Sequence, residues 1–211
     1  RKSNTARLHF YMPKRVRESI RFQNLARQYP LKFSSIYVES QDLTNSNKVL
    51  KNALYNHKPL QHKLKPNFNL FFASFLHSIY SGISGHTGHK FFDARIRMVK
   101  PLSSAFTAEN CSYGSRDGLS ISMGLLKSPG HRRNILDENY YRIGGASFFH
   151  FSDYKTNSVF MYSNPTWKDF IETLAHEMVH LYQMSWLKDP YSNHNKNFFA
   201  WKNKFKLAGL G

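Results

Sequence analysis

The segment LAHEMVHLYQ, residues 174–183, holds two histidines four positions apart, with a glutamate directly after the first. On a helix, side chains at this spacing project from one face, so His176 and His180 can reach the same metal ion. Glu177 lies beside the first ligand, where its carboxylate can deprotonate a zinc-bound water, whose pKa zinc lowers to about 7. The predicted chemistry is zinc-dependent peptide hydrolysis, with Glu177 passing its proton to the leaving amine.

A third ligand decides between a zinc site and an ordinary amphipathic helix that happens to carry two histidines. His194 follows His180 after a segment in which Asp189 and Pro190 break the helix and allow the chain to return. The spacing therefore favours a zinc site over the plain helix. The expected Zn²⁺ ligands are His176, His180 and His194.

The residues that follow the motif narrow the class of peptidase. Gln183 and Trp186 stand where the metzincin pattern needs glycine and histidine, which excludes that class. The segments TLAHEMVHLYQM and HNKNFFAWKNKF resemble the SprT-like zinc metallopeptidases over residues 164–210. That resemblance implies a protein or peptide substrate. The SprT-like family includes proteases associated with DNA, so the resemblance also makes DNA a possible partner. It also implies three zinc ligands and a catalytic acid/base: His176, His180, His194 and Glu177.

Three separated motifs in the middle of the chain indicate a different family. They are SGHTGHKFFDARI (84–96), AENCSYG (108–114) and SPGHRRNILDENYYRIGGASFF (128–149). In this order they resemble the CAP superfamily, in the bacterial form of its cysteine-rich-secretory fold. The resemblance covers residues 45–162 and implies a cleft of two histidines and acidic partners, sometimes with a metal. The matching residues are His86, Glu109 and His131.

Each of these three residues also has a structural interpretation, in which His131 bonds within its own loop and Glu109 holds a turn. Five further histidines are scattered, and we interpret them as surface or core residues. They are His57, His62, His77, His89 and His150. Cys111 is the single cysteine, so the chain has no disulfide framework, and burial is the favoured role for it.

Charge is concentrated in the N-terminal third of the chain. The net charge is +17, and residues 1–70 hold 14 basic side chains and 3 acidic ones. Aromatic residues interleave with them, a mixture that grips phosphates and stacks on bases. Nucleic acid is therefore a candidate partner, and a solvated basic face is the alternative. The interleaved aromatic residues are Phe10, Tyr11, Phe22, Tyr29 and Phe33.

Apolar residues make up 41% of the chain, which indicates a globular protein. No run of about 18 apolar residues occurs, so we expect no transmembrane segment. The N-terminus shows no apolar signal-peptide core, although the chain begins at Arg1 and a removed leader stays open. The SprT-like interpretation implies a cytoplasmic protein, whereas the CAP-like interpretation implies a secreted one.

Hydrophobic periodicity predicts a mixture of helices and strands, which is an α+β fold. The two resemblances imply a CAP-like α/β/α sandwich followed by a zincin-type HExxH helix. The expected parts are a basic N-terminal helical segment (1–44), a CAP-like region (45–162) and a metal-site segment (163–211). A strand is expected at 33–40 and a hairpin from 141 onward. Helices are expected at 12–28, 45–58, 67–82, 118–128 and 164–187.

Zinc-dependent peptide hydrolysis with Glu177 as the catalytic base is the preferred function at this stage. The alternative is a CAP-like ligand-binding module with a non-catalytic metal site around His86, Glu109 and His131. A third hypothesis is a nucleic-acid-binding protein dominated by the basic N-terminal third.

Overall fold

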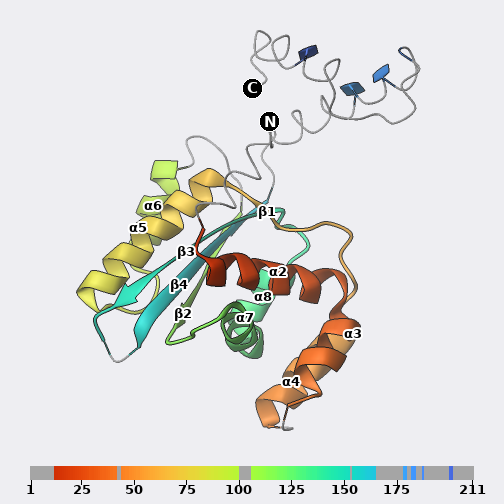
Figure 1. The fold of residues 1–211 in the computed structure, drawn as a ribbon, viewed down its shortest axis with the longest axis horizontal. Coiled ribbons are helices and arrows are strands. Elements are labelled where there is room, and N and C mark those ends of the chain that lie inside the picture. The colour runs from red at the N-terminus through yellow and green to blue at the C-terminus, as the bar shows by residue number, and fades with distance from the viewer. Residues whose placement is uncertain are drawn as a thin grey trace. The chain divides into compact units, whose positions relative to one another are not determined.

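In the computed structural model of the chain, a four-stranded sheet lies at the centre of the described residues (Figure 1). Its strands run in the order β1-β3-β4-β2. β3 pairs antiparallel with β4, β4 pairs antiparallel with β2, and β1 joins β3 in parallel. The hairpin predicted from residue 141 onward is confirmed by β3 and β4. The strands are Lys65–Pro66 (β1), Thr107–Tyr113 (β2), Arg142–His150 (β3) and Lys155–Ser163 (β4).

The structure describes residues 12–41, 44–99, 106–152 and 154–164, with short pieces at 178–179, 182–183, 187 and 200–201. The chain divides into two compact units, residues 1–164 and 165–211, and the sheet belongs to the first. Most of the helix predicted over 164–187 lies outside the described residues. So do the four residues of the predicted zinc site, His176, Glu177, His180 and His194.

Helices cover both faces of the sheet, as expected for an α/β/α sandwich (Figure 1). On one face, α5 packs along β3 and β4, and α6 packs against α5. On the other face, α2 packs on α7 and β3, while α7 and α8 contact β2. Adjacent glycines of β3 mark the two faces, because Gly144 meets α5 and Gly145 meets Val16 of α2. The helices are Lys14–Gln28 (α2), Phe68–Ser84 (α5), Phe92–Val99 (α6), Gly118–Lys127 (α7) and Pro129–Leu136 (α8).

Local capping explains where several of these helices begin and end. Asn67 starts α5 by accepting a hydrogen bond from the Leu70 amide at 3.1 Å. Asp117 starts α7 with a reciprocal capping box involving Ser120. The sequence places the end of α5 at Gly82, but the helix continues to Gly85, whose φ of 66° is the left-handed conformation that glycine adopts readily.

The strand expected at 33–40 is wrong. Pro30–Phe33 forms the short helix α3, and Ser34–Val38 forms a π-helical turn, η1, before α4 at Asn45–Tyr55. The Glu39 amide donates to the Ser34 carbonyl at 3.0 Å, which is the five-residue spacing of a π turn. Phe33 and Val38 are also five residues apart, and both are fully buried. The turn therefore puts both side chains into one core, whereas a strand would point them to opposite faces.

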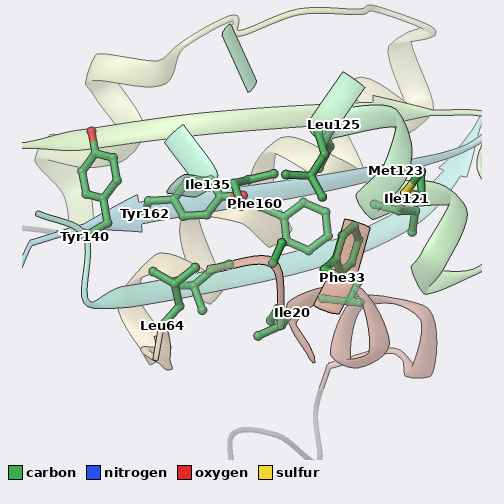
Figure 2. Packing of buried hydrophobic residues seen from close by; sticks show 14 of the residues in the cluster. Ile20, Phe33, Leu64, Ile121, Met123, Leu125, Ile135, Tyr140, Phe160 and Tyr162 are labelled. Atoms are coloured by element: carbon green, nitrogen blue, oxygen red, sulfur yellow. The ribbon is translucent and has the colours of Figure 1, made fainter. Parts of the chain in front are cut away.

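The main hydrophobic core lies between the sheet and the helices of the α2 face (Figure 2). It joins residues from both sides of the expected boundary at residue 44, since Ile20 and Phe33 pack in the same cluster as Ile121 and Phe160. Phe33 is therefore a core residue and is unable to stack on a nucleic-acid base. The N-terminal helices are part of the same folded unit as the sheet.

The buried Arg27 connects α2 by hydrogen bonds to the end of α8 and the segment that follows it. The Arg27 guanidinium donates to the carbonyls of Ile135 (2.6 Å), Asp137 (2.9 Å) and Tyr140 (2.8 Å). Burial lowers the pKa of Arg27 to about 10, so the group keeps its charge at neutral pH. This basic residue of the N-terminal third serves packing and is unavailable to a polyanion.

Because α5 lies very close to the sheet, a side chain larger than glycine at position 144 should strongly lower the stability of the fold. A Cβ at this position would overlap the backbone of Leu70 and Phe71, so Gly144→Ala should lower the free energy of unfolding by at least about 1–3 kcal/mol. Gly124 lies in α7 with open space around it, so Gly124→Ala should raise it by about 0.5–1 kcal/mol. Urea unfolding of both variants tests the packing, and equal stabilities would contradict it.

Candidate functional site

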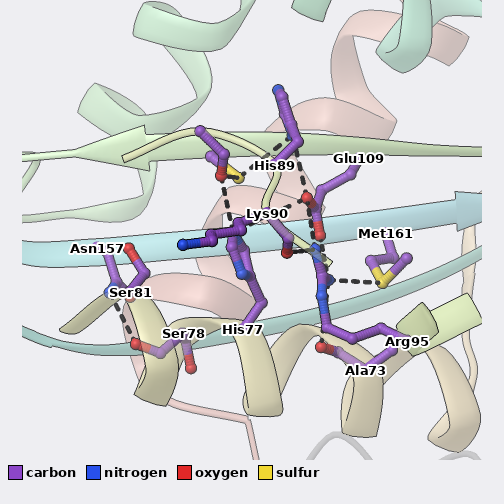
Figure 3. A network of polar contacts seen from close by, with 12 residues as sticks. Ala73, His77, Ser78, Ser81, His89, Lys90, Arg95, Glu109, Asn157 and Met161 are labelled. Carbon is purple, nitrogen blue, oxygen red and sulfur yellow. Dashed lines mark hydrogen bonds and ion pairs between the residues drawn. The ribbon is translucent and has the colours of Figure 1, made fainter. Parts of the chain in front are cut away.

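A buried ion pair lies between β2 and α6 on the α5 face of the sheet (Figure 3). Arg95 of α6 contacts both carboxylate oxygens of Glu109 on β2, with Nη1 to Oε2 at 2.5 Å and Nη2 to Oε1 at 3.0 Å. Arg95 is 5% exposed and Glu109 is 6% exposed. Arg95 also donates to the carbonyl of Lys90 at 3.2 Å. Two-point contact and additional hydrogen bonds are what a buried ion pair needs to offset its loss of hydration.

Two histidines approach the same carboxylate. Nδ1 of His89 lies 3.0 Å from Oε1 of Glu109, and half of the His89 side chain is exposed. Nε2 of His77, on the buried face of α5, lies 3.9 Å from the same oxygen. That nitrogen donates to the carbonyl of Gly88 at 2.7 Å. Glu109 therefore holds a half-exposed histidine above it and a buried histidine beside it.

The electrostatics keep Glu109 charged and His77 neutral. Burial alone would raise the pKa of Glu109, but hydrogen bonds from His89 and Arg95, together with the charge of Arg95, hold it below its usual value. Burial lowers the pKa of His77 by more than the neighbouring carboxylate raises it. The ionised Glu109 therefore accepts the Nδ1–H of His89, and in the neutral tautomer that makes this bond the lone pair is at Nε2.

The loop after α5 fixes the position of His89. Its backbone is held at His86, whose carbonyl accepts hydrogen bonds from Ser81 at 2.5 Å and from His150 at 3.1 Å. Two residues on, the Gly88 amide donates to the Tyr113 hydroxyl at 2.9 Å. Gly88 has a φ of 96°, which only glycine adopts without strain. The loop therefore turns at Gly88 and delivers the next residue to Glu109.

The three residues predicted for the CAP-type cleft take different positions. Glu109 is at the centre of the polar cluster. His86 is exposed, and its ring lies edge-on to Tyr80 at 6.2 Å between centroids. His131 of α8 is half-buried, and burial, followed by the charge of His89, lowers its pKa. The carbonyl of His131 accepts a hydrogen bond from the side chain of Asn110 at 3.0 Å, one residue after Glu109 on β2.

His77, His89 and Arg95 are functional candidates that sequence reasoning did not select. His89 and Arg95 both lie in the quoted motif SGHTGHKFFDARI, three and nine residues after His86. The motif therefore marked the segment that forms the site, but spacing alone does not show which of its histidines contacts Glu109. His77 had no motif to mark it, and it reaches the cluster from a helix face whose other buried residues, apart from Leu70, are small or polar.

Three buried side chains, those of His77, Glu109 and Cys111, lie close enough together to be candidate metal ligands. One ligand atom each from His77, Glu109 and Cys111 lies within 4.8 Å of the others. Three observations argue against zinc at this point. Nε2 of His77 already donates to Gly88, and Arg95 already neutralises Glu109. Burial, followed by the charge of Glu109, raises the pKa of the Cys111 thiol, whereas zinc binds the thiolate. The trio does not fit a zinc ion.

A cavity of about 560 Å³ lies elsewhere in the same unit. Its lining residues come from α2, η1 and the start of α7, and none belongs to the polar cluster. They are Glu18, Arg21, Phe22, Leu25, Tyr37, Asp117 and Leu119. The polar cluster is therefore the stronger candidate site, because titratable groups converge there.

Residues 61–164 match the family model of the CAP, or cysteine-rich secretory protein, family. The match includes β1–β4 and α5–α8, together with every residue of the polar cluster. This match supports the CAP-like resemblance over residues 61–164. A comparison with curated proteins found no match.

Solved structures that match part of this chain come from three bacteria. The first is a cysteine-rich secretory protein from Staphylococcus aureus (17% identity, 57% of this chain, 38% of that chain, TM-score 0.40). The second is an extracellular protein containing an SCP domain from Bacillus anthracis (19%, 54%, 36%, TM-score 0.41). The third is an outer surface protein from Borrelia burgdorferi (20%, 60%, 97%, TM-score 0.44). The chain spans 38% and 36% of the length of the first two. None of these matches is to a SprT-like peptidase, so that interpretation stays a prediction.

Removal of the charge on Glu109 should destabilise the fold. Glu109→Gln leaves the buried Arg95 without its counter-charge, so we expect a loss of about 3–5 kcal/mol in the free energy of unfolding. Glu39 pairs with Lys51 at the surface at 3.6 Å, so Glu39→Gln should cost about 0–1 kcal/mol. Urea unfolding at neutral pH provides the comparison, and a similar small loss for both variants would contradict the buried pair.

Proposed function

We propose that the protein is a CAP-type ligand-binding module whose binding site contains His89 and His131 above the Glu109–Arg95 pair. One observation carries the proposal. His89 is half exposed, while Nδ1 of its ring is held at 3.0 Å by a carboxylate that is almost completely buried. A surface histidine oriented in this way presents Nε2 in a fixed direction toward an incoming ligand.

The chemistry of the exposed ring nitrogens supports Zn²⁺ as a ligand or co-ligand. Histidines that bind a metal through one nitrogen usually donate the other N–H to a carboxylate, as His89 does to Glu109. The lowered pKa of His131 keeps its ring neutral near pH 7, so it too offers a lone pair. Imidazole nitrogens suit zinc. When bound, the ion would supply a positive charge and an open coordination position to an anionic ligand group.

The role of Glu109 in this site is to orient His89. Its charge is already neutralised by Arg95, so it has little attraction left for a second cation. Zinc binding would therefore depend on the two imidazole rings. This is the non-catalytic metal site of the alternative function, with His89 taking the place that the sequence suggested for His86.

We propose that the protein is secreted, since the family match is to cysteine-rich secretory proteins. None of the helices among the described residues is long and apolar enough to cross a bilayer. Nucleic-acid binding by the basic N-terminal third remains a prediction, which the burial of Arg27 weakens at that position.

Zinc titration tests the binding site. Isothermal titration of the full chain with zinc chloride should detect binding that His89→Ala or His131→Ala weakens by about 10–100-fold. His86→Ala is the matched control, because His86 lies in the same loop, is exposed and should leave the affinity unchanged. If His89→Ala and His86→Ala bind zinc equally well, the proposed site is wrong.

A zinc peptidase is the second candidate function, and it depends on the spacing of His176, Glu177, His180 and His194 in the sequence. Glu177→Gln should keep the metal and abolish cleavage of a casein substrate, because the glutamate deprotonates the zinc-bound water. His194→Ala should lose zinc that His89→Ala retains. Metal analysis of the two variants separates the sites, and the absence of casein cleavage by the zinc-loaded wild-type chain would overturn this second function.

A further inference from the structure

The helix α5 has its polar and apolar faces reversed. Its buried residues are mostly small or polar, and Ser74, His77 and Ser78 are at most 1% exposed. Its outer face carries Phe68 (54% exposed), Phe72 (39%), Phe75 (37%) and Ile83 (57%). A surface helix normally turns its apolar stripe toward the core and its polar face to water. Burial within this unit therefore does not explain the apolar side of α5.

The polar residues on the inner face of α5 are matched to the sheet. Ser74 donates to the carbonyl of Gly144 at 3.2 Å, and Asn157 donates to the carbonyl of Ser78 at 2.8 Å. Small side chains also allow the close contact with Gly144. The orientation of the helix is thus fixed by its inner face, and the outward direction of the phenylalanines follows from it.

The apolar surface continues beyond the helix. Gly82 packs against Phe148 and the backbone of Phe149, and the ring of Phe149 meets that of Phe151 at 5.0 Å between centroids. Phe149 is 45% exposed and Phe151 is 72% exposed. The resulting surface is here named the apolar stripe. It consists of Phe68, Phe72, Phe75, Ile83, Phe149 and Phe151.

Four lysines and two aspartates, Asp93 and Asp153, lie close to the apolar stripe in the sequence. Residues 61–92 contain three lysines and no aspartate or glutamate, and α5 itself contains no charged residue. Lys63 and Lys65 are exposed just before the helix. Lys155 is exposed in the β3–β4 turn beside Phe151. Lys90 lies over the ring of Tyr80 at 5.8 Å. Exposed lysines therefore occur just before α5, in the loop after it and at the start of β4.

We propose that the apolar stripe docks on the surface of an anionic lipid bilayer. An uncharged helix face of aromatic and aliphatic residues, bordered by lysines, is the arrangement of a helix that lies in the membrane interface. The 17 residues of α5 would lie flat over about 25 Å. The lysines and the net charge of +17 complement the negative charge of the lipid headgroups. The proposal is independent of the metal site, because none of the residues of the apolar stripe belongs to that site.

Vesicle sedimentation with the full chain tests this docking. The chain should bind vesicles of phosphatidylcholine containing about one third phosphatidylserine, and bind pure phosphatidylcholine much more weakly. The double variant Phe72→Ser/Phe75→Ser should lower the affinity by about tenfold or more, because two apolar side chains no longer enter the interface. Lys65→Glu and Lys155→Glu should each weaken binding by about fivefold or more.

The matched control is Tyr29→Ser/Leu31→Ser, which removes two apolar side chains that are 57% and 53% exposed at the junction of α2 and α3. This control should bind like the wild type, and thermal unfolding should show that every variant remains folded. The proposal is overturned if the wild type does not bind the anionic vesicles or if the control loses as much affinity as the stripe variant. It is also overturned if sedimentation velocity shows self-association through the stripe in place of lipid binding.

Discussion

The ion pair between Arg95 and Glu109 is the interaction on which the arrangement of this face of the domain depends. Two buried charges are costly unless every polar atom around them has a partner. Glu109 therefore accepts a hydrogen bond from His89, while Arg95 donates one to the backbone carbonyl of Lys90. These requirements bind α6, β2 and the loop after α5 into one unit. The exposed part of the site is the ring of His89, and its direction is a consequence of the buried pair.

Arg27 follows the same physical rule on the opposite face of the sheet. Its guanidinium donates to the carbonyls of Ile135, Asp137 and Tyr140, at the end of α8 and in the segment that follows it. A lysine would offer no planar fork to reach all three. The contact makes α2 a structural part of the unit that contains the CAP-like region, although the family match begins at residue 61. The basic composition of the N-terminal third is thus in part a feature of the core.

Much of the fold follows from the sequence because its signals are local. Apolar periodicity and caps mark α2, α4, α5 and α7, and turn residues mark the β3–β4 hairpin. The π turn at Ser34–Val38 was unpredictable, because the pairing of Phe33 with Val38 depends on a core assembled from distant segments. In the site too, some residues are marked by the local sequence and others depend on tertiary contacts. Glu109 was found through its motif, whereas the choice of His89 over His86 depends on the turn at Gly88 and its contact with Tyr113.

Both proposals meet in α5, and they explain its composition together. Its inner face must carry His77 into the polar cluster and small residues against Gly144, so it has little room for apolar side chains. Such a helix could be stable with a polar outer face, as most surface helices are. Exposed apolar side chains that lie together on a surface favour aggregation unless another surface covers them. A lipid interface supplies that cover while leaving His89 and His131, which are outside the apolar stripe, open to a ligand.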